Sequence, residues 1–286
     1  MQLGKIKEAQ AISPDYYMVP PIDRRLTVES DRFSELSNMF AQAGNLERAL
    51  EYALRCADIE KQVAGKEHIW YGNSTIIIGN LYYALGDSIN AEENYLINKN
   101  ICKHTYGEYS ERYVDALLSL ASVNTDFSMK DGLDKATRYL DEAYSIAHKR
   151  YPLLEAQIVN QQSVIAFRNK NYEQAKTLMM QALSLCELAE GKTSNNYEIL
   201  LSNTIDLYQM FGQYDEAITL GQDFLEACNQ ANRSDSIPAF IMVKISQANI
   251  AKGDINNALV QIEKAENIMR QYGTAKVDYI NILGIM

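Results

Sequence analysis

The sequence predicts an all-α fold, a right-handed α-solenoid of antiparallel helix pairs with about six repeats and the start of a seventh. The first observation is a glycine-like turn residue followed five residues later by alanine, which recurs six times. The second is a helical period of apolar residues that begins at about residue 28. The third is the length of 286 residues, which exceeds what one hydrophobic core usually serves. The turns run from Gly44 to Ala49, Gly86 to Ala91, Asp131 to Ala136, Lys170 to Ala175, Gly212 to Ala217 and Gly253 to Ala258.

Composition limits the classes of function. The formal net charge of −10 argues against nucleic acid or an anionic membrane as the main partner, because both require a basic surface. A hydrophobic content of 47% and a charged content of 22% are typical of a folded chain. No apolar run approaches the roughly 18 residues of a membrane span, and no signal peptide is visible at the start. We therefore expect no membrane insertion and a cytoplasmic location, or a periplasmic one if a signal peptide has been removed.

The cysteines indicate packing rather than disulfide chemistry. Cys102, Cys186 and Cys228 each follow the turn residue of their own repeat at the same interval, and Cys56 is the fourth cysteine. Equivalent positions in stacked repeats lie roughly 10 Å apart, beyond the ~7 Å Cα limit of a disulfide. Reduced and buried thiols are therefore expected.

The repeats divide the chain into three regions. Residues 1–27 are an irregular N-terminal segment or cap, residues 28–271 are the repeat array, and residues 272–286 are the first helix of a truncated further repeat or a C-terminal cap. The repeats cover about residues 28–69, 70–110, 111–152, 153–195, 196–237 and 238–271. First helices are expected at 28–42, 70–85, 111–127, 153–169, 196–211 and 238–252, and second helices at 46–64, 88–104, 132–150, 172–188, 214–231 and 255–271.

The register of the repeats is tighter than these boundaries. Small-residue pairs in the first helices, from Leu36–Ser37 to Ile245–Ser246, recur at a spacing of 42 four times and then of 41. The corresponding spacings of the turns are 42, 45, 39, 42 and 41. The spacing of 45 indicates three extra residues in the turn around 128–132. The spacing of 39 that follows predicts that the connection at 150–152 is shorter by three residues. Asn45, Asp87 and Asp254 are expected to cap second helices, and Pro152 and Pro238 to stand at the start of first helices.

These features resemble the tetratricopeptide repeat. The small residue of the first helix, the aromatic residue after it, the turn and the alanine carry the resemblance, best in GNLERA (44–49), GQYDEA (212–217) and GDINNA (253–258). The usual unit has about 34 residues. The spacing of 42 is similar to the kinesin light chain subclass and to many bacterial arrays. The fourth repeat departs from the pattern, because Lys170–Asn171 replaces the turn glycine.

The resemblance implies that the first helices line a concave groove. Ten groove positions are amide, hydroxyl, aromatic or charged residues that suit an extended peptide or a helical segment. They are Asn38, Gln42, Asn80, Tyr83, Ser122, Asn160, Phe167, Arg168, Asp206 and Gln209. Asn38 and Asn80 share one repeat position, which resembles the asparagine ladder of superhelical members. The cation positions of the family's carboxylate clamp are Ser34, Ile76, Leu118 and Ser122 here, so recognition of an acidic tail is not supported.

No catalytic constellation is visible, and the sequence predicts a protein that is not an enzyme, without metal or cofactor. His68, His104 and His148 each lie near the end of a second helix or in an exit loop, where favourable charge at a helix C-terminus explains them. Metal-ligand spacings and a glycine-rich phosphate loop are absent from the sequence.

The predicted function is a non-catalytic scaffold that binds a protein or peptide partner. An alternative is a regulatory or substrate-recruiting N-terminal part of a larger protein, such as a caspase-like protease, a sensor kinase or a transcription regulator, whose output domain lies beyond Met286. A receptor for peptide pheromones is a third class, although residues 1–30 are too short to supply its output domain. The apolar end of the chain also suggests self-association through an open C-terminal repeat.

Overall fold

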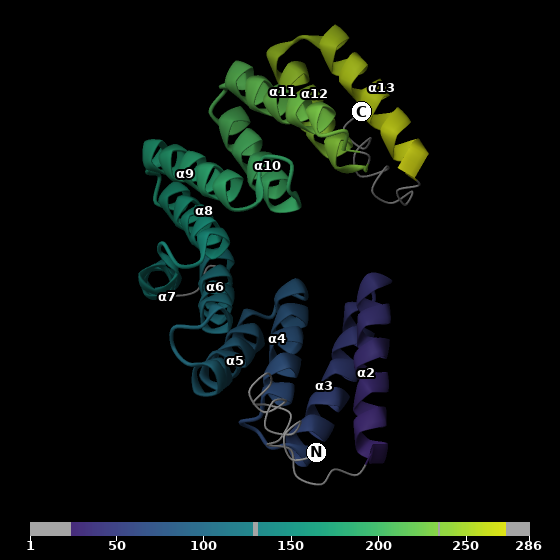
Figure 1. The fold of residues 1–286 in the computed structure, drawn as a ribbon, viewed down its shortest axis with the longest axis vertical. Coiled ribbons are helices and arrows are strands. Elements are labelled where there is room, and N and C mark those ends of the chain that lie inside the picture. The colour runs from purple at the N-terminus through teal and green to yellow at the C-terminus, as the bar shows by residue number, and fades with distance from the viewer. Residues whose placement is uncertain (1–23, 128–130, 234, 273–286) are drawn as a thin grey trace, which may run out of the picture. The chain divides into compact units, whose positions relative to one another are not determined.

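The computed structural model describes residues 24–127, 131–233 and 235–272, and within these residues it contains twelve α-helices and no strand (Figure 1). The helices are α2 (Arg24–Gln42), α3 (Leu46–Val63), α4 (Ile69–Ala84), α5 (Ser88–Tyr106), α6 (Glu111–Asp126), α7 (Gly132–Ala147), α8 (Pro152–Arg168), α9 (Tyr172–Glu190), α10 (Asn195–Met210), α11 (Tyr214–Gln230), α12 (Ile237–Lys252) and α13 (Ile255–Tyr272). Helix α2 already includes residues 24–27, which precede the predicted start at residue 28. Predictions for residues 1–23 and 273–286 lie outside the described residues.

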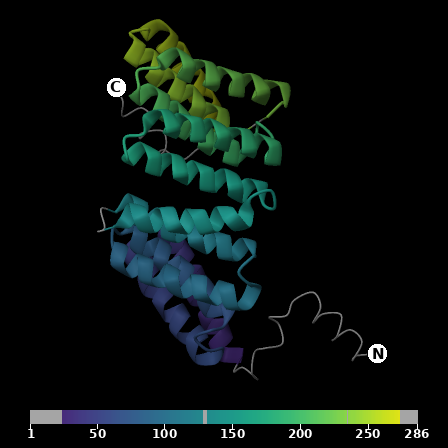
Figure 2. The same ribbon diagram turned by 90° about the vertical axis from the view of Figure 1, so that its left-hand side faces the viewer.

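The helices pack as consecutive pairs. Within repeats, α2 packs on α3, α4 on α5, α8 on α9, α10 on α11 and α12 on α13. Within the two units, second helices also contact the first helix that follows them, in the pairs α3 with α4, α5 with α6, α9 with α10 and α11 with α12. The chain divides into two compact units, residues 1–146 and 147–286, and the helices stack side by side within each unit (Figure 2). This architecture confirms the predicted all-α solenoid of helix pairs.

The turn between the two helices of each repeat has a left-handed residue in all six repeats. The φ angles are 77° at Gly44, 83° at Gly86, 58° at Asp131, 63° at Lys170, 71° at Gly212 and 89° at Gly253. At five of these turns the next N–H donates to the carbonyl oxygen five residues back, as in Asn45 to Phe40 at 2.9 Å. This hydrogen bond is that of a Schellman motif, which ends a helix through a left-handed residue. The repeated turn therefore marks the same local geometry even where glycine is replaced.

A second left-handed turn ends the second helices. It falls at Gly65, Gly107, Lys149, Gly191 and Asn232, with φ between 50° and 97°. These residues are spaced by 42, 42, 42 and 41, so the first five repeats each have a second turn in a common register. The interval from Asp131 to Lys149 is three positions shorter than the interval from Gly86 to Gly107. The prediction that the connection at 150–152 recovers the three extra residues is therefore wrong, because the shorter helix α7 recovers them.

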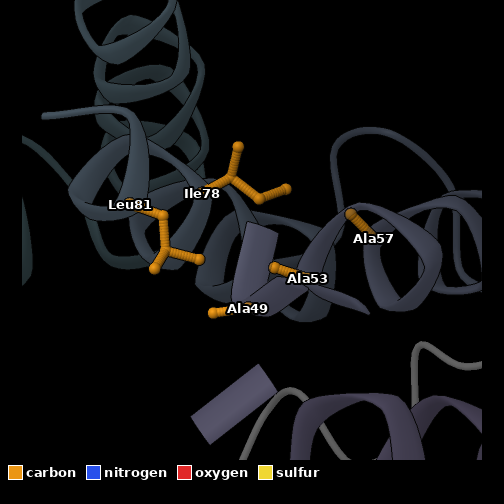
Figure 3. Packing of buried hydrophobic residues seen from close by; sticks show 5 residues of the cluster. All are labelled: Ala49, Ala53, Ala57, Ile78 and Leu81. Carbon is orange, nitrogen blue, oxygen red and sulfur yellow. The ribbon is translucent and has the colours of Figure 1, made fainter. Parts of the chain in front are cut away.

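The alanine five residues after each turn is buried where the two helices of a repeat meet. All six alanines are 0–2% exposed. In α3, Ala49, Ala53 and Ala57 also pack with Ile78 and Leu81 of α4, the first helix of the next repeat (Figure 3). A methyl group at these positions allows the helix backbones to approach closely, because a larger side chain would have to displace its neighbours.

The predicted helix starts are confirmed. Asn45, Asp87 and Asp254 each accept a hydrogen bond from the backbone N–H three residues later, at 3.1, 3.1 and 3.2 Å. Pro152 and Pro238 lie in the first turn of α8 and α12. None of the described helices is long and apolar enough to cross a membrane.

Candidate functional site

The ten predicted groove residues all lie on first helices, from α2 to α10. Asn38, Gln42, Asn80 and Arg168 are exposed, and the other six are half-buried. Five of the ten belong to the N-terminal unit and five to the C-terminal unit. Whether these residues bind a partner stays a prediction, but all of them reach the surface of their unit.

A pocket in the C-terminal unit brings together two of the predicted residues, Phe167 and Asp206. It has a volume of about 270 Å³ and lies where α8, α9 and α10 meet. We call it the apolar pocket, and it is lined by Ser163, Val164, Phe167, Met179, Asn203, Asp206, Leu207 and Met210. Sequence reasoning missed Asn203, Leu207 and Met210, although they lie within about one helical turn of Asp206 on the same helix. Met210 is 66% exposed, so it forms an accessible edge of the pocket.

The charge of Asp206 is already matched from within the unit. Lys244 of α12 places its Nζ 2.7 Å from Oδ1 and 2.6 Å from Oδ2 of Asp206. Gln209 donates from Nε2 to the backbone oxygen of Lys244 at 3.2 Å, which ties α10 to α12 a second time. Because the carboxylate has a lysine partner, the apolar pocket offers no unmatched charge from Asp206. Its walls suit an apolar or neutral group.

Aromatic side chains border the apolar pocket at the end of α8. The ring centroids of Phe167 and Tyr172 are 5.6 Å apart, those of Tyr172 and Phe211 5.1 Å, and those of Phe167 and Phe211 6.2 Å. Lys176 places its Nζ 5.6 Å from the Phe211 centroid. Edge-to-face and tilted packing of this kind contributes about 0.5–1.5 kcal/mol per pair and holds the rings in place. The ring of Phe167 is therefore held in place where it lines the apolar pocket.

Asn160 adds a polar group on the same face of α8. It precedes Val164 by four residues and Phe167 by seven, which places all three on one side of the helix. Its Oδ1 is buried and has no hydrogen-bond partner within the described residues. A buried acceptor without a donor costs roughly 1–3 kcal/mol, and this oxygen is covered by its neighbours rather than open to the pocket.

In the N-terminal unit the predicted residues are held by neighbouring helices. Asn80 accepts at Oδ1 from the hydroxyl of Tyr95 at 2.8 Å, and burial raises the pKa of Tyr95 to about 12. Tyr83 donates to the carboxylate of Asp126, and its ring packs edge-on against Phe127 with centroids 5.3 Å apart. A carbonyl oxygen has two lone pairs, so Asn80 keeps acceptor capacity toward a peptide.

The titratable groups have structural explanations. His68 is the N-cap of α4 and accepts at Nδ1 from the N–H of Trp70 at 3.2 Å, so its predicted role at a helix C-terminus is wrong. His148 lies 2.8 Å from the carboxylate of Glu155. Among the described residues, no group of three or more His, Cys, Asp or Glu side chains could hold a metal ion.

The four thiols are free and buried, as predicted. Burial raises the pKa of Cys102 to about 11, and burial also raises the pKa of Cys56, Cys186 and Cys228. Because the thiolate is the reactive form, a raised pKa makes these cysteines poor nucleophiles at neutral pH.

The paired helices, the left-handed turns and the buried alanines define a helical-repeat protein whose repeats expose their first helices. Two family models match the sequence, both described as tetratricopeptide repeat, over residues 31–69 and 154–230. The chain therefore contains tetratricopeptide repeats over these residues. Repeats of this family place it among the protein–protein interaction scaffolds. No curated protein matches the sequence.

Solved structures share the fold. The crystal structure of BtubC (BKLC) from P. vanneervenii is 19% identical, covers 80% of this chain and 93% of its own, and has a TM-score of 0.61. A Rap protein complexed with Competence and Sporulation Factor is 13% identical, covers 90% of this chain and 74% of its own, and has a TM-score of 0.60. The Rap conjugation gene regulator of the plasmid pLS20 in complex with the Phr* peptide is 14% identical, covers 86% and 75%, and has a TM-score of 0.60. At these identities the likeness concerns the fold.

Proposed function

We propose that this protein is a non-catalytic scaffold that binds an extended peptide or a helical segment of a protein partner, with the apolar pocket as the anchor site. The observation that carries the proposal is the pocket itself, whose apolar walls are reached from the surface of the first helices α8 and α10. Interfaces of this kind obtain most of their affinity from a few large side chains that fill a pocket.

The size and lining of the apolar pocket favour one apolar side chain. Pockets for drug-sized ligands measure roughly 300–1,000 Å³, and this pocket is smaller at about 270 Å³. Phe167, Met179, Leu207 and Met210 supply carbon and sulfur surface. Methionine adapts its shape to the group that it contacts, so leucine, methionine and phenylalanine anchors would all fit.

An amide group at the pocket suits the main chain of a bound segment. The exposed Asn203 lines the pocket wall. Its amide can donate to a peptide carbonyl and accept from a peptide N–H, which adds directional contacts to the apolar anchor. Two of the similar structures hold a peptide or protein factor, which supports a peptide ligand for the same fold.

The test is a selection of random peptides on the immobilised full chain, followed by affinity measurement with fluorescence anisotropy. We expect selected peptides to share a large apolar residue. Met210→Glu should weaken their binding at least about tenfold, because it places a charge at the pocket edge. The matched control is Met39→Glu on α2, where the methionine is 64% exposed and outside the pocket.

Circular dichroism must show that both variants keep their helices. Equal affinity of the selected peptides for Met210→Glu and Met39→Glu would overturn the assignment of the apolar pocket. Failure to select any peptide on a folded chain would overturn the peptide-binding proposal itself.

A further inference from the structure

A cavity in the N-terminal unit has a different chemistry. It has a volume of about 220 Å³ and lies where α2, α3 and α4 meet. Helix α2 contributes Ser30 and Asp31, α3 contributes Ile59, Glu60 and Val63, and α4 contributes Trp70. We call it the acidic cavity, because its described lining has two carboxylates and no lysine, arginine or histidine.

Polar groups hold the carboxyl of Glu60 in the wall of the cavity. The Ser74 hydroxyl donates to Oε2 of Glu60 at 2.5 Å. Ser30 Oγ lies 3.3 Å from Cys56 Sγ, and Ser74 Oγ lies 3.6 Å from the same sulfur. Ser30 and Ser74 are each at least 94% buried, so the network is part of the interior rather than a solvated surface.

Comparison among the repeats shows that this network is an exception. Glu60 follows its turn residue Gly44 at the interval at which Cys102 follows Gly86, and the other repeats have buried apolar or thiol side chains at this position. They are Cys102, Ala147, Cys186, Cys228 and Met269. Ser74 is likewise exceptional, since the equivalent residues of the later first helices are buried and apolar. They are Ala116, Ile158, Leu200 and Ile241.

The exception works against stability. Glu60 is half-buried, so its carboxyl group is partly withdrawn from water at some cost, and five other repeats show that this position accepts an apolar or thiol side chain. Ser74, Cys56 and Ser30 all interact with this carboxylate, which can accept about four hydrogen bonds and so retains capacity for a further donor. A role for the carboxylate in binding explains why the first repeat differs.

We propose that the acidic cavity binds an ammonium group carried on a short aliphatic stem, as in a lysine side chain of a protein partner. Glu60 and Asp31 supply the opposite charge, and Ile59 and Val63 supply an apolar wall for the stem. Trp70 supplies an aromatic ring, and a cation near the face of tryptophan is attracted by the ring quadrupole. The volume admits one side chain rather than a drug-sized molecule.

This inference goes beyond the proposed peptide anchor, because it concerns the other compact unit and a charged rather than an apolar group. It predicts that a partner presents a lysine to the N-terminal unit, whatever occupies the apolar pocket. The two proposals can therefore fail separately.

The experiment uses Trp70 as its probe, because it is the only tryptophan in the chain. The full chain is titrated with Nα-acetyl-lysine methylamide, and tryptophan emission and ligand-observed NMR are recorded. We expect a saturable response to the lysine compound. The norleucine analogue has the same stem without the ammonium group, and it should bind at least about tenfold more weakly.

Two variants locate the response. Glu60→Gln keeps the size of the side chain and removes its charge, and it should weaken binding at least about tenfold. The matched control is Glu51→Gln on the exposed face of α3, where Glu51 pairs with Arg55 at 2.6 Å, and it should bind as the unchanged chain does. If Glu60→Gln fails to fold by circular dichroism, the exposed Asp31→Asn takes its place.

Three outcomes would overturn the proposal. The first is an absence of saturable binding in both emission and NMR. The second is equal binding of the norleucine analogue, which would indicate that the cavity recognises only the aliphatic stem. The third is full binding by a folded variant that lacks the carboxylate.

Discussion

The turn residue Lys170 allows the repeat geometry to be tested with one substitution. Lys170 has φ of 63°, whereas four of the six equivalent turn residues are glycine. A left-handed conformation costs a residue with a Cβ atom roughly 1–2 kcal/mol, and glycine avoids this cost. Glycine also loses about 0.5–1 kcal/mol more conformational freedom on folding. We therefore expect Lys170→Gly to raise the free energy of unfolding by up to about 1 kcal/mol.

The matched control is the same substitution in a helix. Lys264 lies exposed in the interior of α13, where glycine is less favourable than lysine by about 0.5–1 kcal/mol. Lys264→Gly should lower the free energy of unfolding by about that amount, so the two variants should differ in sign. The reverse change at a glycine turn, Gly212→Lys, should destabilise by up to about 1 kcal/mol.

Urea unfolding followed by circular dichroism measures the three variants. The slope of the transition must stay unchanged for the midpoints to be compared as stabilities. If Lys170→Gly destabilises the chain as much as Lys264→Gly does, the turn at residue 170 does not have the left-handed conformation on which this reasoning depends.

Two further predictions concern the packed interior. Ala217→Leu should lower the free energy of unfolding by roughly 1–3 kcal/mol, because Ala217 is fully buried and a larger side chain must displace its neighbours; an unchanged melting midpoint would contradict its place between the helices. Burial first, and the neighbouring charge of Asp31 to a lesser extent, raises the pKa of Glu60 above its ordinary value of 4.5. The folded chain therefore binds the Glu60 proton more tightly than the unfolded chain, so the contribution of this group to stability is fully present below about pH 4.5 and is lost as pH rises through the folded pKa. Urea midpoints of Glu60→Gln and the unchanged chain, compared from about pH 4.5 to 7.5, should move in favour of Glu60→Gln as pH rises, and parallel curves would contradict the shift.

The sequence predicts the helix pairs well because their signals are local and repeated. Each turn has a left-handed residue, and a small alanine follows it where the helices touch, so six copies reinforce one another. The element that is shortened by three residues after the insertion at 128–132 could not be predicted in the same way. A helical period does not tell a shorter second helix from a shorter loop, and only the left-handed Lys149 shows that α7 is the shorter element.

The apolar pocket was only partly predictable. Phe167 and Asp206 could be chosen from their repeat positions, but the ion pair of Asp206 with Lys244 depends on how α10 packs on α12. Met210 could not be chosen, because a methionine at the end of a helix is equally suited to a core or to a surface. Its exposure becomes known only when the side chains around it are placed.

The acidic cavity could have been found from the sequence. Glu60 follows the turn residue of its repeat at the same interval as Cys102, Cys186 and Cys228 follow theirs, so the four residues occupy one repeat position. Each buried position of a repeat array comes with comparison positions in the other repeats, all with nearly the same backbone. Where five of six repeats bury a thiol or an apolar group and the sixth has a half-buried carboxyl, the fold alone cannot be the reason for the carboxyl. Specificity in such a protein is therefore to be sought where a buried position departs from the repeat, and Glu60 with Ser74 is such a departure at the junction of α2, α3 and α4.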